Sequence, residues 1–468
     1  MNRISALSGG IAELRRRVRG AVTLPGDEAY DQERTGFQLH EPRTPDVIVT
    51  ATDTDDVRGA VAFAAEHGLP VAVLSAGHGL GAFIDGGMLI RTSGLRELHV
   101  DPQRRSARMA AGVQWQQVIE AAAPYGLAPL SGSTPLVGAV SYVLGGGIGL
   151  LARKFGYAAD HVRGLELVTP DGRLRQVTAD SDPDLFWAVR GAGGNFGVVT
   201  SLEVDLFPVS SLYGGSLYFD PTGVPEVLRQ WIRWTADVPD DMTTSIAMIP
   251  FPDVPFLPPM LRGRHVLQLR VAYAGDSVTG ERLVAPLRAA GPVLLDGLGE
   301  VPYLKSETIC NDPTDPNPFY STNAMLEDLD SADADAIMSI AGPGGKFPCV
   351  VEIRHLGGAL ARPATVPNAV GHRDARFLLG VGSRFSSQVP GAEELDRVRV
   401  THRTVLDTVR ARSRGQYLNF LSGESADIDA VRASYDSQDY VRLTQLKAQY
   451  DPNNLFRLNH NIPPVAVR

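Results

Sequence analysis

The sequence predicts an α+β protein with two unlike halves. Residues 46–100 alternate short apolar strands with one helical segment, which is typical of a βαβ unit. Beyond about residue 212, strand-like alternation returns between helical segments, at 212–219, 243–249, 265–273 and 349–356. That second pattern is typical of an antiparallel sheet with helices on one side. A length of 468 residues agrees with roughly two or three domains of about 150 residues each.

The elements of the first half follow from local patterns. Apolar residues at helical spacing predict a helix over 53–67, with Asp53 or Thr54 as its N-cap. In chain order we expect strands at 46–51, 70–75, 87–91, 106–112 and 164–169, and a second helix at 114–125. The C-terminal stretch, 426–464, is predicted to be helical and then extended.

Composition excludes several classes of function. The net charge is −9, so neither nucleic acid nor an anionic membrane is an expected partner. Cys310 and Cys349 are too few for a disulfide framework or a zinc site, and we expect them to stay reduced and no metal to be bound. No apolar run reaches the roughly 18 residues of a membrane span. We expect a cytoplasmic protein, and the strong preference for arginine over lysine suggests a GC-rich bacterial genome.

Three glycine-rich loops lie at 76–81, 138–149 and 191–197. Glycine permits positive φ angles and lets backbone N–H groups approach a pyrophosphate closely. Any one such loop is equally well explained as a tight connection, but the three together favour a large anionic cofactor such as a dinucleotide. None fits the Gly-x-Gly-x-x-Gly pattern with an acid about 20 residues on, so a Rossmann NAD site is disfavoured.

The motifs in these loops resemble those of a known family. They are Ser75-Ala-Gly-His78-Gly79, Thr134-Pro-Leu-Val-Gly138, Leu144-Gly-Gly-Gly-Ile-Gly149, the stretch 184–200 and the ending 450–464. Together they resemble the berberine-bridge-enzyme-like branch of the vanillyl-alcohol-oxidase superfamily, and in particular its monocovalent bacterial members, such as the hydroxynicotine oxidases and the enterocin-pathway flavoenzyme.

The resemblance implies a fold and a domain division. It implies a two-lobed, PCMH-type FAD-binding domain over 40–210 and a substrate-binding α+β domain over 211–425, with a large antiparallel sheet flanked by helices. Residues 426–464 would return to the FAD-binding domain.

The same resemblance implies how FAD is held. His78 occupies the position of the histidine that is bonded to the flavin 8α-methyl group, although a histidine there could also bind a phosphate without a covalent bond. Thr134 stands where many relatives have a cysteine bonded to flavin C6, so we expect a single covalent link. The remaining implied cofactor contacts are Ser75, Ala76, Gly77, Gly79, Leu80, Val137, Gly138, Ser141, Gly145, Gly147, Gly149, Asn195, Val198, Val199, Asn459 and Asn461.

One strand suggests a catalytic group. Glu352 and Arg354 alternate with apolar residues, so both point to the same face of the strand. Two charges on a face of an otherwise apolar strand indicate a polar cavity, in which Glu352 is a candidate base. The alternative is an exposed surface ion pair.

A second set of catalytic candidates comes from the resemblance. Tyr417 and Asn419 match the family's Tyr-x-Asn-Tyr motif near the flavin, with Phe420 in place of the second tyrosine. Tyr417 could act as the base if positive charge lowers its pKa from about 10. Tyr142 matches a position that is often near the flavin and is interpreted as a pocket residue.

The sequence therefore predicts an FAD-dependent oxidase. It would remove two electrons from a C–OH, C–N or activated C–H bond of a small secondary metabolite, with hydride passing to flavin N5 and O2 becoming H2O2. Val137 aligns with a gate residue that accompanies oxidase behaviour, or is a plain packing residue. The alternatives are a dual-function flavin oxygenase or oxidative cyclase and a flavin-binding protein without redox turnover. The protein would be a monomer or homodimer whose partners are the substrate and O2.

Overall fold

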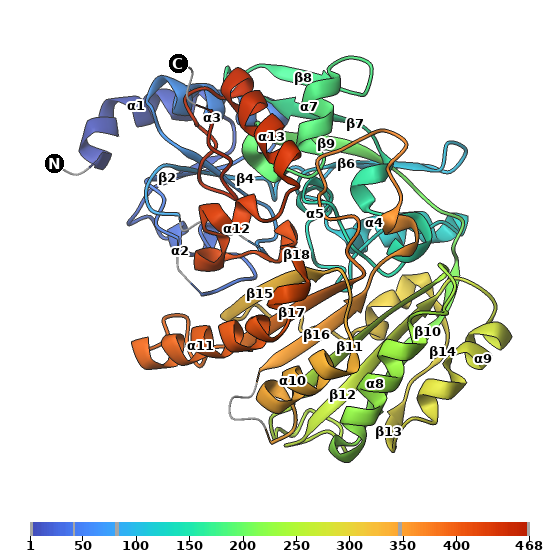
Figure 1. The fold of residues 1–468 in the computed structure, drawn as a ribbon. Coiled ribbons are helices and arrows are strands. Elements are labelled where there is room, and N and C mark those ends of the chain that lie inside the picture. The colour runs from blue at the N-terminus through green and yellow to red at the C-terminus, as the bar shows by residue number, and fades with distance from the viewer. Residues whose placement is uncertain (1–2, 41–42, 80–83, 345–348, 466–468) are drawn as a thin grey trace.

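The computed structural model describes residues 3–40, 43–79, 84–344 and 349–465. Within them the strands form three sheets, two in the upper half of Figure 1 and one in the lower half. The first sheet has the order β1 (Ala21–Thr23), β2 (Val47–Thr50), β4 (Met88–Arg91), β3 (Val71–Leu74). The second has the order β5 (Leu98–Asp101), β6 (Ser106–Ala110), β9 (Val198–Asp205), β7 (Val162–Val168), β8 (Leu174–Val177).

The first sheet contains the predicted βαβ unit. β2 and β3 both pair with β4 in parallel, and α3 (Thr54–Glu66) connects β2 to β3. The helix begins where the sequence predicts, because the Asp53 carboxylate accepts a hydrogen bond from the Asp56 N–H at 2.9 Å. The two upper sheets and their helices share one hydrophobic core. The helices of this half are α1 (Arg3–Arg17), α2 (Tyr30–Glu33), α4 (Trp115–Ala122), α5 (Ala139–Leu144), α6 (Ala152–Phe155) and α7 (Pro183–Val189).

The lower half is the predicted antiparallel sheet. Its order is β13 (Val293–Asp296), β10 (Ser211–Phe219), β12 (His265–Tyr273), β11 (Met242–Pro250), β16 (Val350–His355), β17 (Phe377–Arg384), β15 (Phe319–Leu326), β18 (Ser413–Gly415), and β14 (Gly299–Pro302) also pairs with β10. Four helices pack on one face, namely α8 (Val224–Trp234), α9 (Ser277–Arg288), α10 (Ser331–Ala341) and α11 (Ala392–Thr408). Alternate strand residues such as Leu269 and Ile353 join these helices in a second core. The residues between them therefore turn to the opposite face.

The C-terminal segment returns to the upper half. It contains α12 (Ile428–Arg432) and α13 (Ser437–Tyr450), and α13 lies beside α7 in Figure 1. Lys447 on α13 is fully buried, pairs with Asp451 at 2.7 Å and donates to the Asn195 carbonyl at 2.6 Å. These bonds tie the C-terminal segment to the third glycine-rich loop, 252 residues earlier in the chain.

Two central strands of the large sheet, β15 and β17, were not predicted from the sequence. β17 contains Gly380 and Gly382, and β15 has a polar run at 321–323, so neither shows a clean alternation of apolar side chains. Of the helices in the described residues, none is long and apolar enough to cross a membrane.

Candidate flavin and substrate site

A cavity of about 490 Å³ lies where the glycine-rich loops face the antiparallel sheet. Most of the predicted site residues line it: Ser75, Ala76, Gly77, His78, Gly79, Thr134, Val137, Gly138, Ser141, Tyr142, Gly145, Val198, Val199, Glu352, Arg354, Tyr417, Asn419 and Asn459. The structure thus brings together both the cofactor and the catalytic candidates, from segments more than 300 residues apart in the chain.

Four predicted residues do not line this cavity. Asn195 is buried behind it and bonds to the backbone of Ala192, His460 and Ile462. Gly147 and Gly149 are close-approach positions: a Cβ on Gly149 would collide with the Ser131 carbonyl. Asn461 likewise lies outside the lining. For these four a contact with the cofactor stays a prediction, and Leu80 lies outside the described residues.

His78 lies on the cavity wall, and its side chain makes no hydrogen bond to any residue that the structure describes. Both of its ring nitrogens are buried and have no partner among the described residues. Burial lowers the pKa of His78 to about 4, against an opposing effect of the Asp312 carboxylate. The imidazole is therefore neutral at pH 7. Its ring stacks on Phe37, with the ring centroids 4.0 Å apart and the planes 10° apart.

The sheet contributes a cluster of charges beside the cavity, of which Glu352 and Arg354 are on the lining. Arg270 on β12, Ser245 on β11 and Arg354 on β16 occupy one row across three adjacent strands. The Glu352 carboxylate accepts from Arg270 Nη1 at 2.6 Å, from Ser245 Oγ at 3.2 Å and from Arg354 Nη2 at 2.9 Å. The four side chains are buried or nearly so, which excludes an exposed surface pair. Asp312 adds a second acid, 3.5 Å from Arg270.

Glu352 and Tyr417 differ in ionisation. Burial alone would raise the pKa of Glu352, but Arg354 and Arg270 lower it below its usual value, so the group is a carboxylate at neutral pH. Burial raises the pKa of Tyr417 to about 12, although its hydroxyl accepts bonds from Gly147 N at 2.8 Å and Asn419 Nδ2 at 3.2 Å. Tyr417 could act as a base only if its pKa were lowered, and the structure raises it instead.

Comparisons with known proteins agree with this arrangement. Residues 45–178 match the family model of an FAD binding domain, and 416–463 match the one described as berberine and berberine like. The chain is 30% identical over 461 residues to (R)-6-hydroxynicotine oxidase of Paenarthrobacter nicotinovorans, covering 96% of this chain and 97% of that protein.

The chain belongs to the berberine-bridge-enzyme-like family of FAD-linked oxidoreductases.

Other relatives in the family act on different molecules. Chitooligosaccharide oxidase of Gibberella zeae is 24% identical, covering 94% of this chain and 92% of that protein. The crystal structure of 6-hydroxy-D-nicotine oxidase from Arthrobacter nicotinovorans superimposes with a TM-score of 0.82 at 26% identity, covering 95% of this chain and 98% of that one. A solved chitooligosaccharide oxidase has a TM-score of 0.83 at 22% identity, covering 98% and 100%. The fold is therefore the PCMH-type fold that the motifs predict.

The cavity fits the family's FAD. Besides His78, buried polar atoms without partners among the described residues belong to Thr134, Tyr142 and Asn459, all on the lining. Buried polar groups without partners are rare in folded proteins and call for a ligand or water. Backbone also faces open space there, because a Cβ on Gly193 would find no atom closer than 4.0 Å. The glycine loops and His78 would hold the cofactor, and the charged cluster would face a substrate.

Several lining or supporting residues were not predicted, among them Arg270, Asp312 and Phe37. Arg270 had a signal, because Gln268 and Arg270 lie on one face of an apolar strand in the same way as Glu352 and Arg354. Asp312 begins a proline-rich stretch, 312–318, with no local pattern that points to a site. Phe37 precedes all the recognised motifs, and nothing in its neighbours points to His78.

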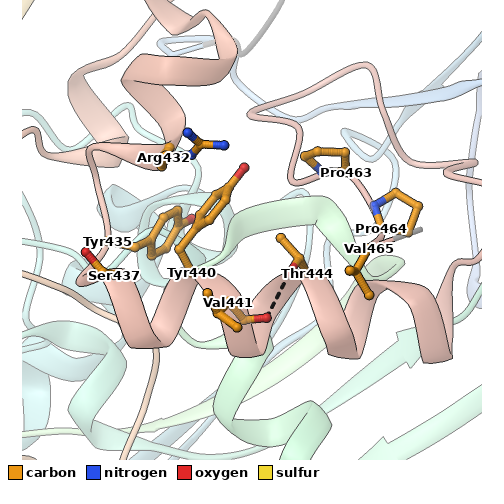
Figure 2. A pocket seen from close by; sticks show the side chains of 9 residues that line it. All are labelled: Arg432, Tyr435, Ser437, Tyr440, Val441, Thr444, Pro463, Pro464 and Val465. Atoms are coloured by element: carbon orange, nitrogen blue, oxygen red, sulfur yellow. Dashed lines mark hydrogen bonds between the residues drawn. The ribbon is translucent and has the colours of Figure 1, made fainter. Parts of the chain in front are cut away.

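A second hollow lies elsewhere on the molecule. Figure 2 shows it between α13 and the C-terminal stretch, with Tyr435, Tyr440 and Pro463 on its walls. It shares no lining residue with the cavity described above. None of the predicted site residues contributes to it, so we assign it no part in the family's chemistry.

Proposed function

We propose that the protein is an FAD-dependent oxidase that takes two electrons from a C–OH, C–N or activated C–H bond of a small molecule. The observation that carries the proposal is a neutral His78, without a hydrogen-bond partner among the described residues, on the wall of a glycine-lined cavity that also contains buried charged residues. Bound FAD would supply the hydride acceptor and the reaction with O2 that yields H2O2. Val137 on the cavity lining supports the use of O2, by analogy with the family's gate position.

His78 would be the single covalent anchor, through a bond to the flavin 8α carbon. A neutral imidazole has a free lone pair for that bond, and the low pKa of His78 keeps it neutral across the physiological range. Thr134 lines the same cavity, but its hydroxyl cannot form the thioether that a cysteine forms.

Glu352 would accept the proton that the substrate loses. Of the two candidate bases, it is the one ionised at neutral pH. Arg270 and Arg354 fix the carboxylate in place but also weaken it as a base, which favours substrates whose leaving proton is acidic. Tyr417, protonated, would donate its hydroxyl proton to the substrate or cofactor.

Covalent attachment is tested on acid-precipitated protein. Yellow colour in the pellet and the mass of FAD on the His78 peptide are expected for the native chain, and neither is expected for His78→Ala. His67→Ala is the matched control, because His67 also stacks on a phenylalanine, Phe63, at 4.0 Å but lies outside the cavity lining. Flavin that stays entirely in the supernatant of the native protein would disprove the link.

Oxidase activity is tested with a panel of alcohols, amines and oligosaccharides. Each is mixed with the enzyme first without oxygen, to monitor loss of the flavin absorbance, and then with O2. One H2O2 per substrate oxidised is expected. ¹⁸O from O2 in the organic product would instead favour an oxygenase, and no flavin reduction by any oxidisable substrate would favour a protein without redox turnover.

A further inference from the structure

The orientation of His78 has an unusual cause. A functional histidine is generally fixed by a hydrogen bond to one ring nitrogen, which also selects the tautomer. His78 has no such bond among the described residues. Among the described residues, the one ring that contacts His78 is that of Phe37, which stacks on it with planes 10° from parallel. Stacking fixes the plane of the imidazole and leaves both nitrogens available at its edge.

Phe37 is itself held by the His78 loop. Phe37 N donates to the Ala76 carbonyl at 3.0 Å, and Gln38 N donates to the Gly77 carbonyl at 2.9 Å. Gly36 and Gly77 make this close approach possible, because a Cβ on either glycine would lie 2.8 Å from the Cα of the other. Two backbone hydrogen bonds thus join residues 37–38 to residues 76–77.

The same segment is fastened to the substrate half. The Gln38 side chain donates to the Phe319 carbonyl at 2.8 Å and accepts from Phe319 N at 3.2 Å. Asn317 N donates to the Phe37 carbonyl at 3.0 Å. Gln38 is buried, and its bonding partner Phe319 is the first residue of β15. Residues 36–38 therefore connect the histidine loop to the large sheet.

We propose that Phe37 is the positioning residue for covalent flavin attachment, and that Gln38 makes this positioning depend on docking of the substrate half. The inference rests on the proposed bond to His78. In that reaction an N–C bond forms, the imidazole N–H and one 8α-methyl C–H are lost, and the two electrons and two protons pass to O2 as H2O2. Phe37 takes no part in the bond changes and acts only by holding the ring.

The test follows the appearance of acid-stable flavin in newly made protein. Cells are induced briefly, the full-length chain is purified at successive times, and acid-stable and total flavin are measured for each sample. In Phe37→Ala the rate is expected to fall about two- to tenfold, the equivalent of one aromatic pair, while total bound flavin is unchanged. Phe37→Tyr keeps the ring and should retain the native rate. Gln38→Ala should show a smaller loss.

Phe207→Ala is the matched control, because Phe207 is a partly buried ring that pairs with Phe155 at 4.1 Å in the same half. If Phe37→Ala does not accumulate, Phe37→Leu, which removes the ring but keeps apolar volume, replaces it. A native attachment rate in Phe37→Ala, or in Phe37→Leu where it replaces Phe37→Ala, would overturn this inference alone. An equal loss in Phe207→Ala would do the same. A native chain that never gains acid-stable flavin would overturn the covalent link and this inference together.

Discussion

The two walls of the cavity differ in how far their buried polar groups are paired. On the glycine-loop wall, His78, Thr134 and Tyr142 have buried polar atoms without a hydrogen-bond partner among the described residues. On the sheet wall, Glu352 is held by two arginines and a serine. An unpaired buried polar group costs about 1–3 kcal/mol, so the first wall is complete only when a ligand supplies the missing partners.

The difference assigns a role to each wall. The unpaired polar atoms of the glycine-loop wall are suited to a permanently bound ligand, which agrees with a resident FAD. The charges of the sheet wall are already paired with one another, although Arg270 Nε has no hydrogen-bond partner among the described residues. Under the proposed function these charges would act on a substrate that enters and leaves. The following changes test this division, from the largest expected effect to the smallest.

Glu352→Gln should have the largest effect on catalysis. It keeps the shape of the side chain but removes the negative charge that would accept the proton. The rate of flavin reduction in stopped flow without oxygen should fall by about 10²–10⁴, the usual contribution of a general base. The acid-stable flavin should be unchanged, because the other wall is untouched.

Glu166→Gln is the matched control for that change. Glu166 also accepts from a serine, Ser201, and pairs with an arginine, Arg108 at 2.9 Å, and its side chain is 19% exposed against 17% for Glu352. It does not line the cavity. A native reduction rate in Glu352→Gln, or an equal loss in the control, would remove Glu352 from the chemistry.

Arg270→Met should have the largest effect on stability. It leaves Glu352 and Asp312 buried with one cation fewer, and breaking a buried pair in this way costs about 3–5 kcal/mol. The urea midpoint, followed by tryptophan fluorescence, should drop clearly. Arg108→Met removes a half-exposed partner and should cost at most about 1 kcal/mol. Equal midpoints for the two variants would contradict a buried, mutually dependent cluster.

Much of this division could be predicted from the sequence, but not all of it. The alternation in 349–356 placed Glu352 and Arg354 on one face because strand geometry is local. The third member of the cluster, Arg270, joins them only through the pairing of Ser245 with both arginines, which depends on strand order and register. Nothing local to a strand specifies its neighbour.

The glycine loops show the same limit. Their sequence predicts close backbone approach, and their resemblance to the family predicts what approaches. Yet Gly149 packs against the Ser131 carbonyl, so not every glycine serves the cofactor directly. Phe37 could not have been predicted, because its contact with His78 joins two segments about 40 residues apart in the chain. Backbone hydrogen bonds hold these segments together.

Acidification should lower the free energy of unfolding through protonation of His355 in the unfolded chain. Burial, together with Arg153 and Arg376, lowers the pKa of His355 to about 2, and Arg153 donates to its Nε2 at 3.0 Å. In the unfolded chain its pKa is near 6.5, so the unfolded state binds the extra proton first. Stability is therefore full at neutral pH and is lost as pH falls below about 6.5, by about 2 kcal/mol at pH 5.

His355→Gln should flatten this dependence. The change in urea midpoint between pH 7.5 and pH 5 should be smaller in the variant than in the native chain. Replacing the exposed His99 by glutamine should leave the dependence unchanged. Identical pH profiles for His355→Gln and the native chain would mean that His355 takes up its proton in the folded state.

Tyr417→Phe should have the smallest effect on catalysis. Because burial raises the pKa of Tyr417 to about 12, the hydroxyl keeps its proton throughout the working range, and the variant loses only hydrogen bonds. One hydrogen bond is worth about 0.5–1.5 kcal/mol, so the rate of flavin reduction should fall by less than about tenfold. The dependence of that rate on pH between 6 and 10 should keep its shape. A loss as large as that of Glu352→Gln, with a lost ionisation in the pH profile, would instead make Tyr417 the base and leave the sheet wall a purely electrostatic surface.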